Sequence, residues 1–184
     1  MKLLSYLFVL SFLFVLGACS QMEDSAPVSP QDEITLSKVP VPFKATFEGL
    51  ALISIPPTSE CGSQLPLSTL TGSGVGTHLG NYTSDSYACL VPDGTITGKG
   101  IFINGYHTVI AANGDELYAT WSGEYETDLT TGMVAYTYTF LFTGGTGRFV
   151  GVTGEVEGSA TAPYGGPGEP KAITAEMFGW ILFE

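Results

Sequence analysis

Basic residues are scarce in this sequence. Its 184 residues include 6 lysines and arginines against 18 aspartates and glutamates, for a formal net charge of −12. Nucleic-acid binding needs clustered basic side chains, so we exclude nucleic acid as a partner. The 3 cysteines form no Cys-x-x-Cys pair, and His78 and His107 lie far apart in the chain. The sequence therefore predicts no metal site and no redox site.

The chain begins with a short apolar run. Lys2 precedes the run, which extends from Leu3 to Leu16 and ends at Gly17-Ala18-Cys19. A basic end, a short apolar stretch and small residues are typical of an export signal, and the run is shorter than the about 20 apolar residues of a transmembrane helix. The cysteine after Leu-Gly-Ala resembles the lipobox of bacterial lipoproteins. This resemblance implies that residues 1–18 are a lipoprotein signal peptide and that Cys19 carries the lipid.

Residues 19–42 are rich in serine, proline, glutamine and acidic side chains and have few large apolar groups. Such a composition buries too little surface to fold, so we expect a disordered acidic tether. A lipid on Cys19 attaches a protein to a membrane without any spanning segment. Ser20 directly after the cysteine favours the outer membrane by the bacterial sorting pattern. We therefore expect a lipid-anchored protein on the periplasmic or the surface face of the outer membrane, in the bacterial cell envelope.

Residues 43–184 have the length of one domain and the pattern of an all-β fold. Apolar and polar residues alternate along about eight segments that turn residues separate, among them Pro92-Asp93-Gly94 and Asn113-Gly114. The segments are residues 43–53, 70–83, 87–91, 94–103, 106–111, 116–124, 134–142, 150–157 and 173–183. The last is apolar on both faces, so we expect it to be covered on its outer side. An eight-stranded antiparallel β-barrel is the expected fold because closure removes both sheet edges. A two-sheet sandwich is the alternative that the pattern leaves open.

Five glycines fall within residues 144–154. They are compatible with a hairpin between two strands and with the glycine turn of a dinucleotide-binding domain. A dinucleotide fold needs a helix after the glycines. Residues 152–158 instead alternate like a strand, and Pro163, Pro167 and Pro170 interrupt any helix beyond them. The sequence therefore predicts a hairpin and no cofactor.

Three segments resemble a known family. Gly144-Gly145-Thr146-Gly147-Arg148-Phe149 resembles the Gly-Gly-Thr-Gly-x-Phe hairpin of dirigent proteins and, more loosely, of allene oxide cyclases. Residues 77–80 and 111–118 are similar to segments of exported bacterial proteins in the same barrel group. The resemblance covers residues 43–184 and implies a calycin-like barrel with an apolar cavity at one end. Plant members guide cyclisation or radical coupling of small apolar molecules, but their catalytic carboxylates cannot be placed on this chain.

Candidate site residues are those that the alternation turns inward. His107 is in phase with Ile101, Ile103 and Val109, and an inward imidazole can act as a general acid or base or be a hydrogen-bonded core residue. Aromatic side chains with polar tips can line a cavity for a small apolar ligand. The alternative is that they only fill the core. The ligand-cavity candidates are His78, Tyr82, His107, Trp121, Tyr136 and Tyr138. Cys61 and Cys89 can close a disulfide in an exported protein, and the sequence leaves their pairing open.

No nucleophile in the sequence has a base placed beside it, so no catalytic residue can be named. We therefore expect a lipid-anchored, non-catalytic envelope barrel that binds a small apolar ligand, and the sequence leaves a homo-oligomer open. One alternative is an isomerase or cyclase of the allene oxide cyclase or dirigent type that acts on a small hydrophobic substrate. Another is a structural or interaction protein with a filled barrel. A cavity with an inward carboxylate or histidine would favour the enzyme.

Overall fold

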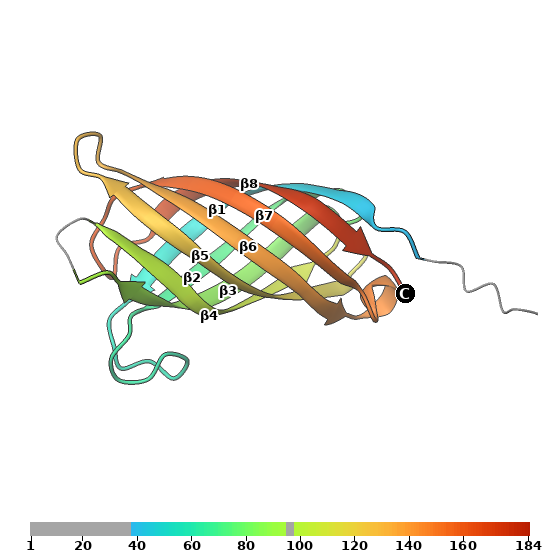
Figure 1. Ribbon diagram of the computed structural model, residues 1–184, viewed down its shortest axis with the longest axis horizontal. Coiled ribbons are helices and arrows are strands. Elements are labelled where there is room, and N and C mark those ends of the chain that lie inside the picture. Colours follow the sequence, from blue (N-terminus) through green and yellow to red (C-terminus); the bar gives the residue numbers. More distant parts are fainter. Residues whose placement is uncertain (1–37, 95–97) are drawn as a thin grey trace, which may run out of the picture. The chain divides into compact units, whose positions relative to one another are not determined.

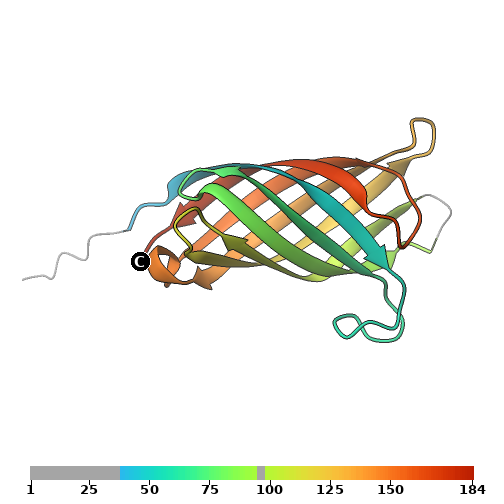
Figure 2. The same ribbon diagram turned by 180° about the vertical axis from the view of Figure 1, so that it is seen from behind.

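The computed structural model describes residues 38–94 and 98–184, which form a closed antiparallel barrel (Figures 1 and 2). Its strands are β1 (Val41–Ser54), β2 (Leu67–Gly76), β3 (Gly80–Pro92), β4 (Lys99–Ile110), β5 (Glu116–Asp128), β6 (Met133–Gly145), β7 (Thr153–Pro163) and β8 (Lys171–Leu182). Each strand pairs with the next one along the chain, and β8 closes the barrel on β1. The expected eight-stranded antiparallel barrel is confirmed, and the sandwich alternative is wrong.

The barrel holds its own core. The described residues belong to one compact unit, Ser37–Glu184, and every strand has a hydrogen-bonded neighbour on both sides. The predicted signal peptide (1–18), the predicted lipidation site Cys19 and the part of the expected tether up to residue 37 lie outside the described residues. No helix in the described part of the chain has the length and apolar character needed to cross a membrane.

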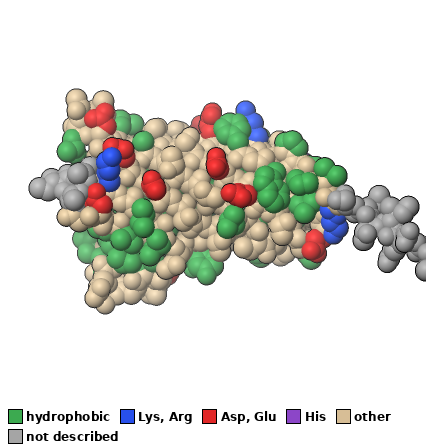
Figure 3. Space-filling view, viewed as in Figure 1, with side chains coloured by type: hydrophobic (Ala, Val, Ile, Leu, Met, Phe, Trp, Pro, Cys, Tyr) green, Lys and Arg blue, Asp and Glu red, His purple; other side chains and the backbone are tan. Residues whose placement is uncertain are grey.

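Alternation along the strands separates an apolar interior from a polar outer wall. In β1, Phe43 and Phe47 are buried, whereas Lys44 and Glu48 are exposed. The stripe of apolar and aromatic residues over 134–142 turns inward in β6, as its period of two predicts. Figure 3 shows acidic side chains scattered over the outer wall. The interior is therefore the apolar part of this molecule.

Bulky interior side chains lie against glycines on neighbouring strands. The strand register places Trp121 beside Gly105 and Tyr138 between Gly123 and Gly158. A Cβ atom on Gly105 would lie 2.6 Å from the ring of Trp121, closer than any van der Waals contact. An eight-stranded barrel has an interior just wide enough for side chains. Pairing a large residue with a glycine gives the aromatic rings room inside it.

One end of the barrel, which we call the base, is plugged by the connection between β6 and β7. This connection contains a short 3₁₀ helix, η1 (Gly147–Phe149). Phe149 is fully buried and stacks on Phe183 with ring centroids 6.2 Å apart. The hairpin expected at residues 144–154 is confirmed, although β7 begins at Thr153 rather than near Val150. Val150 is exposed and does not share the inward face of β7.

The three segments that carry the family resemblance meet at the base. The backbone N–H of Ala112 donates to the carbonyl of Leu79 (3.0 Å), and that of Glu116 donates to the hydroxyl of Thr146 (2.8 Å). The carboxylate of Asp115 accepts from the backbone N–H of Arg148 (3.2 Å) and pairs with its guanidinium (3.7 Å). These segments therefore close one end of the barrel.

The prediction of one strand over residues 70–83 is wrong, because this segment is a hairpin. Strand β2 ends at Gly76 and β3 begins at Gly80. His78 and Gly80 have φ values of 63° and 68°, in the left-handed region that reverses the chain. Glycine is common both in strongly coiled strands and in turns, so the glycines of this segment concealed the turn.

Strand β4 is continuous where the sequence suggested two pieces. Asn104 has a φ of 52°, and the register against β5 shifts between Phe102 and Gly105. A bulge of this kind exchanges the two faces of a strand. His107 does face inward, but Ile101 and Ile103, whose phase predicted its direction, lie on the outer wall.

The outer face of β8 is open to solvent, so the expected cover over this strand is absent among the described residues. Phe178 and Trp180 expose 48% and 40% of their surface. The ammonium of Lys44 lies 5.1 Å from the centre of the Phe178 ring, a cation–π contact on the outer wall. The apolar outer face of β8 is thus a surface feature.

Candidate functional site

A cavity of about 220 Å³ opens at the end of the barrel opposite the base. We call this end the mouth and the space inside it the mouth cavity. The β1–β2, β5–β6 and β7–β8 connections lie at this end (Figure 1). The side chains that line the cavity within the barrel include Ala51, Ile53, Ser68, Leu70, Leu90, Phe102, Trp121, Tyr125, Thr127, Val134, Tyr136, Tyr138 and Ile173. The lining is mainly apolar, as in most sites for small organic molecules.

Aromatic residues of three adjacent strands form one wall of the mouth cavity. Trp121 and Tyr125 lie two steps of the alternation apart on β5, with Gly123 between them on the inward face. The ring of Trp121 meets Tyr138 edge to face at 5.5 Å and lies 5.4 Å from Phe102. Edge-to-face and tilted aromatic pairs of this kind are stabilising and hold each ring in place. The wall is therefore a rigid, preformed surface.

Hydroxyl groups give this aromatic wall its polarity. Burial raises the pKa values of Tyr125, Tyr136 and Tyr138 above the ordinary value for tyrosine, so all three phenols stay protonated near neutral pH. Tyr138 is only 6% exposed, and its hydroxyl has no hydrogen-bond partner among the described residues. The mouth cavity thus contains a neutral donor that no described protein group uses.

The β7–β8 and β1–β2 connections form the rim of the mouth. The β7–β8 connection crosses the rim, tied at one side by a hydrogen bond from the N–H of Tyr164 to the carbonyl of Gly132 and at the other by one from Gly168 to Ile53 (both 2.8 Å). At the end of this connection, the ammonium of Lys171, the first residue of β8, pairs with the carboxylate of Glu169 at 2.8 Å. These are the two charged residues among those that line the cavity, and their charges cancel.

A disulfide fixes the β1–β2 connection beside the rim. The sequence left the pairing of Cys61 and Cys89 open, and in the structure their sulfur atoms are bonded at 2.06 Å. The backbone N–H of Leu90 also donates to the carbonyl of Pro66 (2.9 Å). Pro66 and Leu90 both line the cavity. The disulfide therefore holds one part of the rim against β3.

His107 lies in a separate space nearer the base. Its ring packs edge to face on Phe140 at 5.1 Å and lines a gap of about 20 Å³ together with Tyr82. Burial lowers the pKa of His107 to about 4, so its imidazole is neutral. His107 keeps some exposed surface, but its Nδ1 is buried without a partner in the described part of the chain. The hydroxyl of Tyr82 donates to the carbonyl of Thr46 at 2.9 Å.

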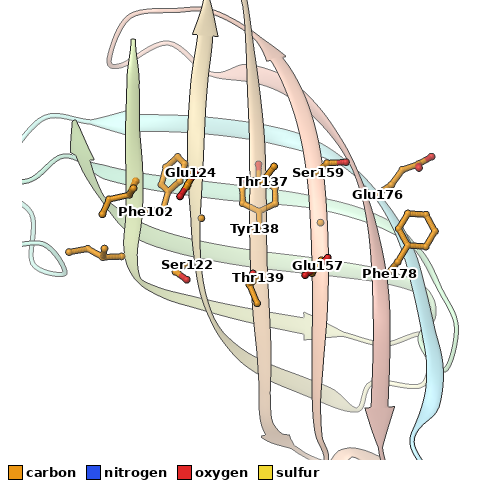
Figure 4. Close-up of a pocket in the computed structure, with 14 residues that line it drawn as sticks. Phe102, Ser122, Glu124, Thr137, Tyr138, Thr139, Glu157, Ser159, Glu176 and Phe178 are labelled. Carbon is orange, nitrogen blue, oxygen red and sulfur yellow. The ribbon is translucent and has the colours of Figure 1, made fainter. Parts of the chain in front are cut away.

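Another hollow, of about 720 Å³, lies on the outer wall across β4 to β8 (Figure 4). Its floor consists of glycines and short side chains such as Thr137 and Ser159. Glu124, Glu157 and Glu176 border it and face the solvent (Figure 4). This hollow is an open depression in a charged wall, so it lacks the enclosure of a site for a small apolar molecule.

The six ligand-cavity candidates therefore separate into three places. Trp121, Tyr136 and Tyr138 line the mouth cavity. Tyr82 and His107 line the small gap near the base, which shares no lining residue with the mouth cavity. His78 is exposed in the turn after β2, where its Nε2 lies 3.3 Å from the carbonyl of Pro42 and its ring contacts Phe183.

Sequence reasoning missed two residues of the aromatic wall. Tyr125 is in phase with Trp121, so extending the alternation along β5 by two steps would have found it. Phe102 was hidden by the bulge at Asn104, because its neighbour Ile101 appeared to be the inward residue. An irregularity of this kind leaves little trace in a hydrophobic pattern.

The described residues contain no group of three or more histidine, cysteine or acidic side chains that could hold a metal ion. Comparisons of the chain with models of protein families, with curated proteins and with solved structures find no match. We therefore base the functional proposal on the mouth cavity and its lining.

Proposed function

We propose that the protein is a lipid-anchored barrel of the bacterial cell envelope that binds a small, mainly apolar molecule in the mouth cavity. The observation that carries this proposal is the enclosed space of about 220 Å³ beside a preformed aromatic wall. An apolar protein cavity of roughly 150 Å³ binds benzene, and sites for drug-sized ligands measure about 300–1,000 Å³. The mouth cavity therefore suits a compound of one or two rings.

The carboxylates on the outer wall support the proposal that the barrel lies in water, next to a membrane and not within it. Glu124, Glu157 and Glu176 face outward from the middle of the wall, and burying such carboxylates in lipid would be costly. A lipid on Cys19 provides the membrane attachment in this proposal. We place the protein at the outer membrane, as Ser20 after the cysteine favours.

The described residues give the cyclase alternative little support. An isomerase or cyclase of the allene oxide cyclase or dirigent type would need an inward acid or base at its substrate. His107 faces the small gap near the base rather than the mouth cavity. Glu169 is the carboxylate on the cavity lining, and it is paired with Lys171 at the rim. The other alternative, a structural or interaction protein with a filled barrel, fits less well than ligand binding because the mouth end of the barrel is hollow.

Native mass spectrometry of the protein purified from its own envelope tests the binding proposal. We expect the wild type to carry a small-molecule adduct that Ala51→Phe loses, because Ala51 lines the cavity and a phenyl ring there fills it. Leu50→Phe is the matched control, since Leu50 is the adjacent residue of β1 and faces outward with 51% of its surface exposed. Absence of any adduct across wild-type preparations, or an equal loss in both variants, would contradict the proposal.

A further inference from the structure

Two buried polar atoms of the barrel interior, the hydroxyl of Tyr138 and the Nδ1 of His107, lack a hydrogen-bond partner among the described residues, and of the two only Tyr138 lines the mouth cavity. Trp121 donates its indole N–H to the carbonyl of Tyr106 (3.3 Å), and Tyr82 donates its hydroxyl to Thr46. Tyr138 is 6% exposed, yet its hydroxyl makes no hydrogen bond within the described ranges. Buried polar groups are nearly always hydrogen-bonded, so a buried hydroxyl without a partner needs a reason.

Packing does not supply that reason. The next inward positions of β6 are Phe140 and Phe142, which fill the interior without a polar atom. A phenylalanine at position 138 would fill the same space between Gly123 and Gly158 and would avoid the cost of burying an unpaired hydroxyl. Tyr138 lines the mouth cavity, so its side chain borders the space in which a molecule would bind.

The charges on the lining limit what that molecule can be. Lys171 and Glu169 are paired at the rim and neutralise each other. The other residues that line the cavity are uncharged. The Tyr138 hydroxyl stays protonated because burial raises its pKa, so it can donate one hydrogen bond. The cavity therefore offers a ligand a mainly apolar surface with no net charge. Among its buried hydroxyl residues, which include Ser68 and Thr127, Tyr138 is the one whose hydroxyl is fully buried without a partner in the described part of the chain.

We propose that the mouth cavity selects an uncharged, one- or two-ring compound carrying a hydrogen-bond acceptor, such as a carbonyl oxygen, which accepts from the hydroxyl of Tyr138. This inference rests on the proposed binding function. The aromatic wall holds the ring system of the ligand, and Tyr138 fixes the orientation of its acceptor. Compounds of the same shape that lack the acceptor leave the hydroxyl unpaired and bind less well than their hydrophobicity alone predicts.

Acetophenone and α-methylstyrene test the inference, because they share one shape and differ in a carbonyl oxygen against a methylene group. Their dissociation constants are measured by NMR titration of the barrel, residues 38–184, whose strands pair only with one another. We expect Tyr138→Phe to lower the ratio of ketone affinity to hydrocarbon affinity about two- to tenfold, the range for one neutral hydrogen bond. Tyr136→Phe, the neighbouring inward tyrosine of β6, is the matched control and should leave the ratio unchanged.

The outcomes separate the two proposals. If wild-type barrel binds neither compound, the binding function itself is wrong. If both compounds bind and Tyr138→Phe leaves their affinity ratio unchanged, binding stands and the acceptor inference is overturned. A fall of the ratio in Tyr136→Phe alone also overturns it, because the donor would then be the other tyrosine. Thermal unfolding of each variant shows that it is folded, and Tyr138→Phe should melt no lower than the wild type since it removes an unpaired buried hydroxyl.

Discussion

His107 shows how burial alone can set the protonation state of a residue. Its ring lies between strands against Phe140, and desolvation holds its pKa at about 4, below the ordinary 6.5. Tyr82, the other titratable residue at the same gap, is also neutral, since burial raises its pKa further above the ordinary value for tyrosine. A neutral imidazole in an apolar gap fits a core residue better than an acid–base catalyst whose pKa must lie near the working pH.

The buried His107 should make stability fall in mild acid. Below about pH 6.5 the unfolded chain protonates this histidine, whereas the folded protein does so only near pH 4. The unfolded state therefore binds more protons in this window, and the free energy of unfolding should fall as the pH is lowered, by up to about 3 kcal/mol. Urea unfolding at about pH 7 and about pH 4.5 measures this loss.

His107→Phe should lose less stability than the wild type over the same pH interval, because the phenyl ring does not titrate. The carboxylates titrate in both proteins, so the difference between them isolates His107. His78→Gln is the control, since His78 lies in an exposed turn. An identical pH dependence in the wild type and His107→Phe would show that His107 is not held neutral.

At the scale of elements, the two ends of the barrel differ in structure: the base is closed and the mouth is open. The base is closed by η1 and by hydrogen bonds among three connections, with Phe149 fully buried. The mouth is bordered by the β7–β8 connection and by the long β1–β2 connection, which the Cys61–Cys89 disulfide ties to β3. The motifs that were easiest to recognise in the sequence belong to the base, and the cavity lies at the other end.

Removing the disulfide should destabilise the protein without unfolding it. The bond closes a loop between residues 28 positions apart, which corresponds to about 3–4 kcal/mol in the chain-entropy treatment. We expect Cys61→Ala/Cys89→Ala to lose this much stability in urea unfolding. Hydrogen exchange should rise in residues 55–66 and stay unchanged in β5 and β6. Equal exchange in residues 55–66 of both proteins would mean that the disulfide does not hold the rim.

At the scale of the whole molecule, the strand order places the mouth away from the point where the chain enters the barrel. β1 begins at the base, where Val41 pairs with Ile181 near the C-terminus (Figure 1). An anchor that precedes β1 therefore joins the barrel at its base. In the proposed function, the mouth lies at the end opposite this junction.

The anchor itself can be tested by fractionating cells that express the full chain. We expect the wild type in the membrane fraction and Cys19→Ser in the soluble fraction, because the proposed lipid supplies the hydrophobic attachment. The variant that reaches the soluble fraction should show the unfolding curve of the wild-type barrel, which holds its own core. Membrane association of Cys19→Ser equal to that of the wild type would contradict lipid anchoring.

Local pattern was enough to predict the strands in which alternation is regular. The inward stripes of residues 43–53 and 134–142 follow from the period of two, since a wrong register would expose every aromatic ring. Prediction was wrong at residues 70–83 and at Ile101, for different reasons. Glycines have no side chain that shows which face of a strand is apolar. At Asn104, a bulge with a positive φ shifts the register of β4, so that inward and outward positions are exchanged beyond it.

Alternation along β6 was enough to place Tyr136 and Tyr138 on the inner face of an all-β domain, because the direction of a side chain depends on its own strand. The folded structure was needed to show that the sheet closes into a barrel, that this barrel is hollow at one end, and that the Tyr138 hydroxyl has no partner among the described residues. Those properties depend on what the opposite wall presents, and that wall comes from β1, β2 and β8, far away in the chain. Cavities are set by the packing of such distant residues, and local patterns carry no record of it.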